Sequence, residues 1–286
     1  VILGMLILFA IFDLIVGVTN DAVNFLNSSI GSKAAPFKVI MIIASAGILA
    51  GVTFSAGMME VARKGIFHPE LFTMPELLIM FLAVMITDIL LLDLFNTYGL
   101  PTSTTVSVVF ELLGAAVALS MIKLAAHADS GLGLLDYINS TQAITIIFGI
   151  LLSIIVAFAS GATIQFIARL IFTFNYEKRL KYYGALWGCL ALTVITFFIL
   201  VKGAKGATFM DPQMVAWMNS HSLIIMGGIF ATSTIILQFL ISAFKINILK
   251  PIVLSGTFAL AMAFAANDLV NFIGVSGGRV GPLGPG

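Results

Sequence analysis

The sequence reads Asn-Asp-Ala-Val-Asn-Phe at residues 20–25 and Asn-Asp-Leu-Val-Asn-Phe at residues 267–272. Both copies stand inside strongly apolar sequence, where one carboxylate and two carboxamides are expensive to bury and commonly functional. The three-residue spacing puts the Asp and the second Asn of each copy on one face of a helix. A polar cluster written twice in an apolar chain predicts an internal repeat with a site between the copies, as in many membrane transporters.

The composition indicates a membrane protein. Of the 286 residues, 60 % are hydrophobic and 9 % are charged, against about 25 % charged in soluble domains, and the mean hydropathy is +1.13. The net charge is +1 and there is no basic block, so nucleic acid is not an expected partner. The single Cys189 excludes a disulfide framework and indicates inert packing.

Long apolar stretches predict an all-α polytopic fold, because a barrel would need ten-residue alternation instead. Most of them approach the ~20 residues that cross a bilayer. They run over 1–27, 37–59, 77–98, 101–122, 143–171, 184–201, 220–244 and 251–275. None of the polar joints between them is long enough for a soluble domain.

The pair 77–98 and 101–122 predicts a re-entrant hairpin. Its joint at 96–105 is rich in hydroxyls, is broken by Gly99 and Pro101, and carries no charge. Such a turn suits a position inside the protein at membrane depth. An ordinary short external turn is the alternative.

The basic residues weakly favour an outside N-terminus under the positive-inside rule. Seven then fall on short inside joints, namely Lys33, Lys38, Lys178, Arg179, Lys181, Lys245 and Lys250. Six fall on longer outside joints, namely Arg63, Lys64, Lys123, Lys202, Lys205 and Arg279. Whether or not the hairpin crosses the membrane, span parity orients the two Asn-Asp motifs oppositely, which predicts an inverted-topology repeat.

The chemistry of the repeated motif suits a small cation, because carboxylates and carboxamides supply hard oxygen ligands. Ser103, Thr104 and Thr105 begin the helix after Pro101, and a helix N-terminus is an anion site. No Lys or Arg stands in either motif, so an oxyanion would meet repulsion from Asp21 and Asp268 unless cations bind with it. This favours cation-coupled cotransport over an anion channel.

Other intramembrane carboxyl groups allow two interpretations. Asp13 lies two turns before Asp21, and it either joins the ion path or stabilises its helix. Asp88, Asp93 and Glu111 on the hairpin arms either line the same cavity or are buried with hydrogen-bonding partners, and burial is favoured.

Three motifs in order resemble the inorganic phosphate transporter (PiT) family. They are the duplicated Asn-Asp-x-x-Asn signature, the segment Glu-Val-Ala-Arg-Lys-Gly-Ile at 60–66, and Tyr-Gly-Leu-Pro-Thr-Ser-Thr-Thr at 98–105. The resemblance covers nearly all of the chain. The Gly that leads the family signature is Val18 in the first copy and Ala265 in the second, and Val106 stands where a His commonly follows the hairpin motif.

The resemblance implies symport of inorganic phosphate with Na⁺, favoured over H⁺, as the coupling ion and no other cofactor. It implies two inverted repeats, each with a broken signature helix and a re-entrant hairpin. Ser103, Thr104 and Thr105 would bind phosphate together with Asp21 and Asp268. The Na⁺ ligands would be Asn20, Asp21, Asn24, Asn267, Asp268 and Asn271. Family members are often dimers, so a homodimer in the bilayer is an expectation.

The predicted organisation is a first repeat at 1–171 that contains the hairpin 77–122, connecting transmembrane helices at 172–250, the start of the second repeat at 251–275, and a linker-like tail at 276–286. The chain opens at Val1 within an apolar segment, and the second hairpin would follow residue 275. We therefore expect a fragment, or missing sequence near 276. The expected location is the bacterial inner (plasma) membrane, with several spans.

Other functions stay open from the sequence. Sulfate or another oxyanion could replace phosphate on the same scaffold. An intramembrane hydrolase would use Asp21 and Asp268 as paired carboxylates, which the flanking Asn residues and the repeat disfavour. A passive channel or a structural membrane subunit is a further alternative.

Overall fold

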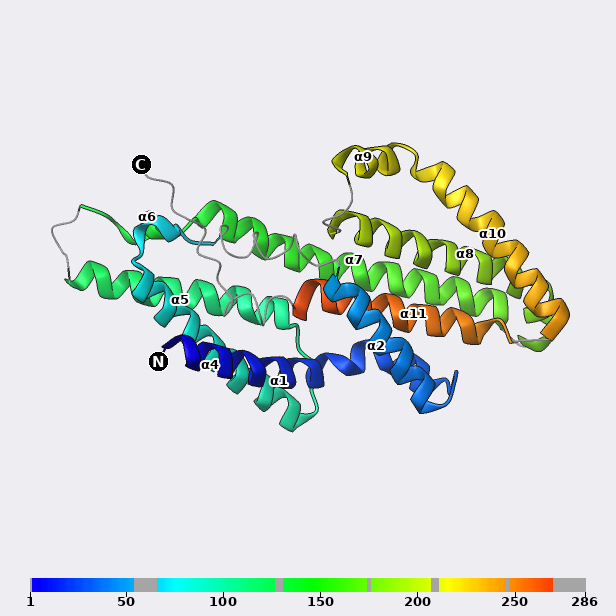
Figure 1. Cartoon of the computed structure of the whole chain (residues 1–286), viewed down its shortest axis with the longest axis horizontal. Helices are drawn as coiled ribbons and strands as arrows, with labels where there is room; N and C mark the ends of the chain where they lie inside the picture. The colour runs from blue at the N-terminus through cyan, green and yellow to red at the C-terminus, as the bar shows by residue number, and fades with distance from the viewer. Residues whose placement is uncertain are drawn as a thin grey trace. The chain divides into compact units, whose positions relative to one another are not determined.

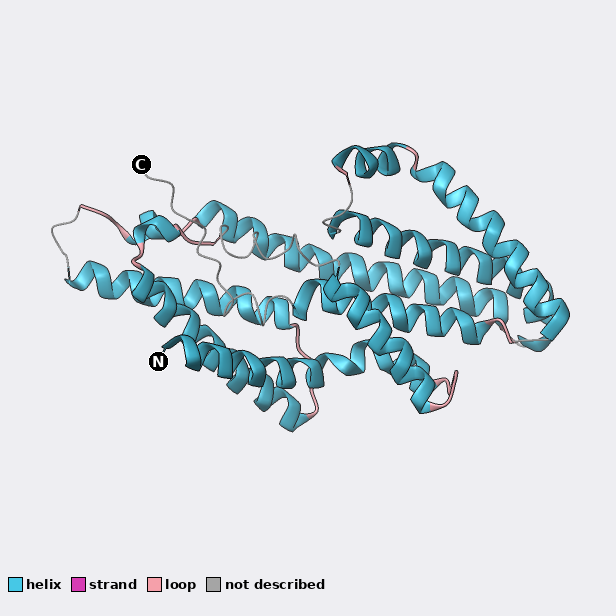
Figure 2. Cartoon of the chain, in the orientation of Figure 1, coloured by secondary structure: helices cyan, strands magenta, loops and turns pink. Residues whose placement is uncertain are grey.

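The computed structural model describes residues 2–53, 66–126, 131–173, 176–206, 211–244 and 247–269. These residues form helices joined by loops, with no strand among them and one isolated bridge between Phe67 and Ile138 (Figure 2). The predicted all-α class is confirmed for the part of the chain that the structure describes.

The helices follow the apolar stretches of the sequence (Figure 1). They are α1 (Ile2–Gly31), α2 (Phe37–Thr53), α4 (Met74–Tyr98), α5 (Thr104–Ala126), α6 (Leu134–Tyr137), α7 (Ser140–Phe172), α8 (Tyr176–Gly206), α9 (Pro212–Ser220), α10 (Ser222–Phe244) and α11 (Leu249–Phe264), with the 3-10 turn η1 (Pro69–Leu71) and the π-helical segment η2 (Ala265–Leu269). The short helices α6 and α9 lie in joints where the sequence predicted no element.

The described residues include five helices that are long and apolar enough to cross a membrane. They are α1, α4, α5, α7 and the central part of α8, and α2, α10 and α11 are shorter apolar helices. Many large apolar side chains on them are exposed, such as Phe158 at 79 % on α7. In lipid such a surface carries no cost, because the hydrocarbon is as apolar as the side chains. The chain is therefore an integral, multi-pass membrane protein.

The chain divides into two compact units. The first comprises residues 1–23, 57–150 and 267–286, and the second comprises residues 24–56 and 151–266. This division follows packing and not sequence duplication, so the predicted repeat boundaries stay a prediction.

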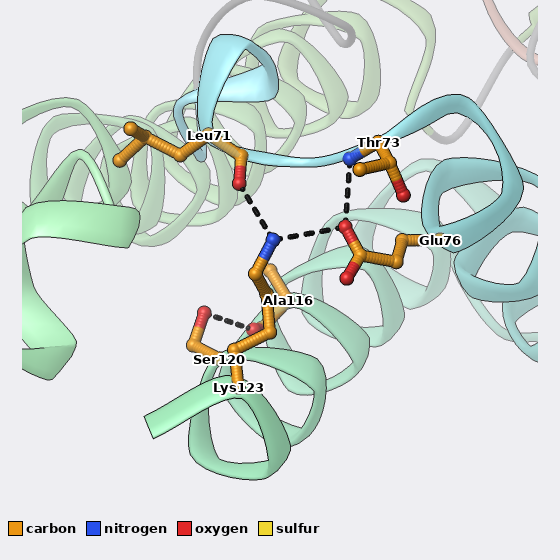
Figure 3. Close-up of polar contacts among 6 residues, drawn as sticks. All are labelled: Leu71, Thr73, Glu76, Ala116, Ser120 and Lys123. Carbon is orange, nitrogen blue, oxygen red and sulfur yellow. Dashed lines mark hydrogen bonds and ion pairs between the residues drawn. The ribbon is translucent and has the colours of Figure 1, made fainter. Parts of the chain in front are cut away.

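The first unit is built on the helical hairpin of α4 and α5. Its buried core contains Met80, Val84, Val108 and Leu112 from the two arms, and Phe72 and Tyr137 pack on it from the connecting segments. At the far end of the hairpin, Lys123 Nζ donates to Leu71 O and to Glu76 Oε2, both at 2.9 Å, and Glu76 also accepts from Thr73 N (Figure 3). The end of α5 is thereby tied to the start of α4.

The hairpin turn follows from local sequence. Gly99 ends α4 in the left-handed conformation with φ of 67°, which a residue with a Cβ adopts only at a cost. Its N–H is bonded to Asn96 O, and Leu100 N is bonded to Phe95 O. This Gly-based cap closes α4, and Pro101 follows where the chain cannot remain helical. The two predicted arms are confirmed as helices, and the re-entrant position of the hairpin stays a prediction.

The second unit packs α2 and α8 against α11, and α10 against α8. A Cβ added to Gly47 would lie 2.5 Å from Phe258 O, and one added to Gly51 would collide with Met262 O and Ala265 Cβ. The two glycines therefore let the backbones of α2 and α11 approach closely. Cys189 is buried with Leu237 and Ile248, which matches its expected packing role.

The signature helix at the first motif differs from the sequence expectation. The resemblance implied a broken helix there, but α1 is continuous from Ile2 to Gly31. Neither Gly nor Pro occurs between Val18 and Ile30, so this stretch lacks the two strongest helix breakers. The second motif instead begins in the π-helical turn η2, so the regular helix changes geometry only at that copy.

Candidate functional site

The start of α5 brings together the aspartates of both motifs within the first unit. Thr104 Oγ1 donates to Asp21 Oδ2 at 3.2 Å, and Thr105 Oγ1 donates to Asp268 Oδ1. Thr104 is buried, and only 6 % of Asp21 is exposed. Two carboxylates that are 247 positions apart in the sequence therefore meet two consecutive hydroxyls.

The helix that carries these hydroxyls begins with Ser103 as its N-terminal cap. Ser103 Oγ accepts from Val106 N at 3.4 Å, and Ser103 O accepts from Ser107 N at 3.0 Å. The N–H groups of the first turn have no intrahelical acceptors and lie at the positive end of the helix dipole. Ser103 is exposed, Thr104 is buried and Thr105 is half-buried, so the three predicted phosphate ligands differ in their access to solvent.

Asn20 anchors the hairpin loop to α1. Its Nδ2 donates to Asn96 Oδ1 at 2.8 Å and to Leu100 O at 3.3 Å, while its Oδ1 accepts from Thr102 N at 2.9 Å. Asn96 in turn donates to Val16 O at 3.1 Å. Asn20 thus uses both ends of its carboxamide to position the loop that leads into Ser103.

The structure tells less about the other three predicted Na⁺ ligands. Asn24 follows Asp21 by one turn on α1, but it belongs to the second unit. Asn267 lies in η2, next to Asp268. Asn271 lies outside the described residues. The structure thus gathers Asn20, Asp21 and Asp268 around the start of α5, and the full Na⁺ ligand set stays a prediction.

Asp268 reaches this site from an unusual turn. It is half-buried in η2, where the π-helical backbone inserts an extra residue into the turn. Such turns are rare and occur frequently at functional sites, because they redirect a side chain that a regular helix would turn away.

Sequence reasoning missed two residues near this site. Asn96 bonds both to Asn20 and to the α1 backbone, and Ser107 bonds to the carboxyl groups of Asp88 and Glu111. A carboxamide at the end of an apolar hairpin arm was a usable signal for Asn96. Ser107 gave none, because a Ser one turn into a helix is common.

The arrangement combines groups for ions of both signs. The hydroxyls and first-turn N–H groups of α5 can donate to the oxygens of an anion. The carboxylates of Asp21 and Asp268 can accept a cation, which would also reduce their repulsion of that anion. The site therefore suits joint binding of an oxyanion and a small cation.

Comparison with known proteins identifies the family of the chain. A model of the phosphate transporter family matches residues 17–278. The chain is 26 % identical over 261 residues to a putative phosphate permease of Thermococcus kodakarensis, covering 89 % of this chain and 61 % of the relative. It is 24 % identical over 265 residues to another from Pyrococcus furiosus, covering 89 % of this chain and 60 % of the relative. The chain thus spans about three fifths of the length of these relatives.

A solved structure shares the fold. The structure described as the sodium-dependent phosphate transporter matches with a TM-score of 0.72 at 18 % identity, covering 96 % of this chain and 66 % of that chain. This match agrees with the predicted all-α polytopic fold, and the inverted repeats and the re-entrant hairpin stay predictions. Together with a family model that spans nearly the whole sequence, it shows that the chain belongs to the phosphate transporter family.

Proposed function

We propose that the chain carries out cation-coupled symport of inorganic phosphate by alternating access, with Na⁺ as the coupling ion. The observation that carries this proposal is the pairing of Thr104 with Asp21 and of Thr105 with Asp268 at the N-terminus of α5. Family membership supports phosphate as the substrate. The name of the structural neighbour, a sodium-dependent transporter, supports Na⁺ over H⁺.

Phosphate would bind at the start of α5. The hydroxyls of Ser103, Thr104 and Thr105 and the first-turn N–H groups would donate to its oxygens. A phosphate that carries a proton could also donate to Asp21 or Asp268, which a sulfate could not do. This difference favours phosphate over sulfate at a site with two carboxylates.

Na⁺ would neutralise the carboxylates while the anion is bound. Asp21 and Asp268 would be ligands, with further oxygens from Asn20, Asn24, Asn267 and Asn271. Because the anion and the carboxylates repel each other in a low-dielectric site, each ligand would bind more tightly when the other is present. This mutual dependence is the physical basis of symport.

The membrane in which the protein acts and its oligomeric state are also part of this proposal. The protein would act in the plasma membrane of a prokaryote, and the two named relatives are archaeal. The protein would form a homodimer, as members of the family often do. The alternative of an intramembrane hydrolase is disfavoured, because the family is one of transporters.

Phosphate uptake into proteoliposomes tests the proposal. The longest native chain would be reconstituted with and without an inward Na⁺ gradient, and Asp21→Asn would be compared with Asp93→Asn. The burial that the sequence favoured for Asp93 is wrong, because Asp93 is exposed on α4, and this exposure makes it a matched control. We expect Na⁺-driven accumulation that is lost in Asp21→Asn and kept in Asp93→Asn.

Each other outcome identifies an alternative. Accumulation that follows a pH gradient and ignores Na⁺ would replace the coupling ion. Uptake that only equilibrates phosphate would indicate a channel. Sulfate uptake without phosphate uptake would overturn the substrate assignment.

A further inference from the structure

The first unit holds a second cluster of carboxyl groups, away from the Asp21 and Asp268 site. Asp13 of α1, Asp88 of α4 and Glu111 of α5 meet beside Ser107. Asp88 is fully buried, and only 3 % of Asp13 is exposed. Three acidic side chains from three helices therefore share one interior position.

The hydrogen bonds around Ser107 require an added proton. Ser107 Oγ lies 2.8 Å from Asp88 Oδ1 and 2.7 Å from Glu111 Oε1. A hydroxyl has one proton to donate, and an ionised carboxylate is only an acceptor. When both contacts are hydrogen bonds, at least one of the two carboxyl groups must itself donate to Ser107.

Each carboxyl group also has an oxygen in need of a donor. Asp13 Oδ1, Asp88 Oδ2 and Glu111 Oε2 are buried without a hydrogen-bond partner. The Asp13 carboxyl group lies close enough to those of Asp88 and Glu111 to interact with them electrostatically. A buried acceptor without a donor is costly, and a carboxyl proton between two of these oxygens would satisfy both.

No positive group of the described residues faces the cluster. The titratable side chains of the three helices are Asp13 and Asp21 on α1, Glu76, Asp88, Asp93 and Tyr98 on α4, and Glu111 and Lys123 on α5. Lys123 is the only base among them, and it is held by Glu76 and Leu71 three turns beyond Glu111 (Figure 3). Among the described residues, no group of three or more acidic, His or Cys side chains has the geometry to hold a metal ion. A proton suits direct contacts between carboxyl groups better than a metal ion does.

The cluster is separate from the candidate transport site but close to it along the helices. Asp13 precedes Asp21 by eight residues on α1, which is about 12 Å of helix. Ser107 follows Thr104 by three residues on α5, about one turn. A change of charge at the cluster would therefore act on the same two helices that carry Asp21 and Thr104.

We propose that Asp13, Asp88, Glu111 and Ser107 form a proton-binding site that exchanges protons with water and adds a pH dependence to transport. Protonation places a hydrogen on a carboxylate oxygen and removes one negative charge. The part of this proposal that concerns transport rests on the proposed function. Proton binding itself does not.

Infrared spectroscopy tests proton binding without transport. The full chain in lipid nanodiscs should show the carbonyl band of a protonated carboxylic acid at neutral pH. We expect Asp88→Asn and Glu111→Gln each to weaken or shift that band, and Asp93→Asn to leave it unchanged. Each variant would first be checked for a monodisperse elution profile and an unchanged circular dichroism spectrum.

The wild-type spectrum keeps this test decisive if a variant fails to fold. Absence of the band at neutral pH in the wild type would overturn the proposal. A band that persists unchanged in folded Glu111→Gln and Asp88→Asn would also overturn it, because the proton would then belong elsewhere.

Phosphate uptake tests the coupling. At a fixed Na⁺ gradient, external pH would be varied for wild type, Glu111→Gln and Asp93→Asn. The protonation state of phosphate changes equally for all three, so only the difference between them matters. We expect Glu111→Gln to lose part of the pH response while it keeps its Na⁺ dependence, and Asp93→Asn to follow the wild type.

The two experiments fail independently. A Glu111→Gln profile equal to that of the wild type would limit the cluster to a structural role and overturn the coupling. If the wild type takes up no phosphate at all, the proposed function fails, while the infrared result still decides whether the proton site exists.

Discussion

The carboxamide of Asn20 holds the loop between α4 and α5 in place. Only 4 % of it is exposed, and it contacts two loop residues and Asn96 on the opposite helix. The loop positions Ser103 and hence the start of α5. The geometry of the candidate phosphate site thus depends on a side chain that donates twice and accepts once.

Asn20→Asp should therefore destabilise the protein. The new carboxylate cannot donate to Asn96 Oδ1 or Leu100 O, and it would lie against both acceptors. Each buried group left unpaired costs about 1–3 kcal/mol, so we expect a loss of about 2 kcal/mol or more. Thermal unfolding in detergent would measure it, with Asn27→Asp, an exposed Asn on the same helix, as the control. Equal melting temperatures for both variants would contradict the anchoring role.

At this scale the structure brings some of the predicted site residues together, and their roles stay a prediction. The aspartates and hydroxyls were expected to share a site, and Thr104 and Thr105 do contact Asp21 and Asp268. Asn20 was expected as an Na⁺ ligand, while the structure shows it bound to a loop about 80 residues away. Spacing along one helix reveals a shared face, but it does not reveal which distant segment meets that face.

At the scale of helices, α2 packs closely on α11 because the glycines at the contact have no Cβ. Gly47 and Gly51 leave room for a neighbouring backbone, and the structure identifies α11 as that neighbour. Helix positions were predictable, because apolar runs of membrane length are strong signals. The continuity of α1 was not, because the expectation of a break came from the resemblance and not from a local helix breaker.

Gly51→Val should separate these two helices. The added side chain would collide with the α11 backbone at Met262, where no rotamer can relieve it. Overpacking typically costs about 1–3 kcal/mol. Gly256→Val on α11 is the control, because a Cβ there meets nothing within 4 Å. We expect a lower unfolding temperature for Gly51→Val only, measured in detergent. A Gly256→Val variant that is equally destabilised would point to helix propensity as the cause.

At the scale of the whole chain, the predicted topology can be read with cysteine labels. The native Cys189 is 2 % exposed, so it should react little with a bulky reagent. Ser32 and Glu70 are both exposed and lie in joints that the charge pattern assigns to opposite sides of the membrane.

A membrane-impermeant maleimide should therefore label Glu70→Cys in intact cells, and Ser32→Cys only after permeabilisation. The unaltered chain measures the background from Cys189. Labelling of both sites from the same side would refute the span count between them. A reversed pattern would keep the count and invert the protein in the membrane.

The two signature motifs have nearly the same sequence but different backbone conformations. The first lies on the regular helix α1, and the second begins in the π-helical turn η2. One residue of a regular helix turns by about 100°, so an inserted residue points the positions after it in other directions. Alignment of the two copies letter by letter therefore does not superpose their side chains. The two aspartates of the repeated pattern are therefore held by two different kinds of helical backbone.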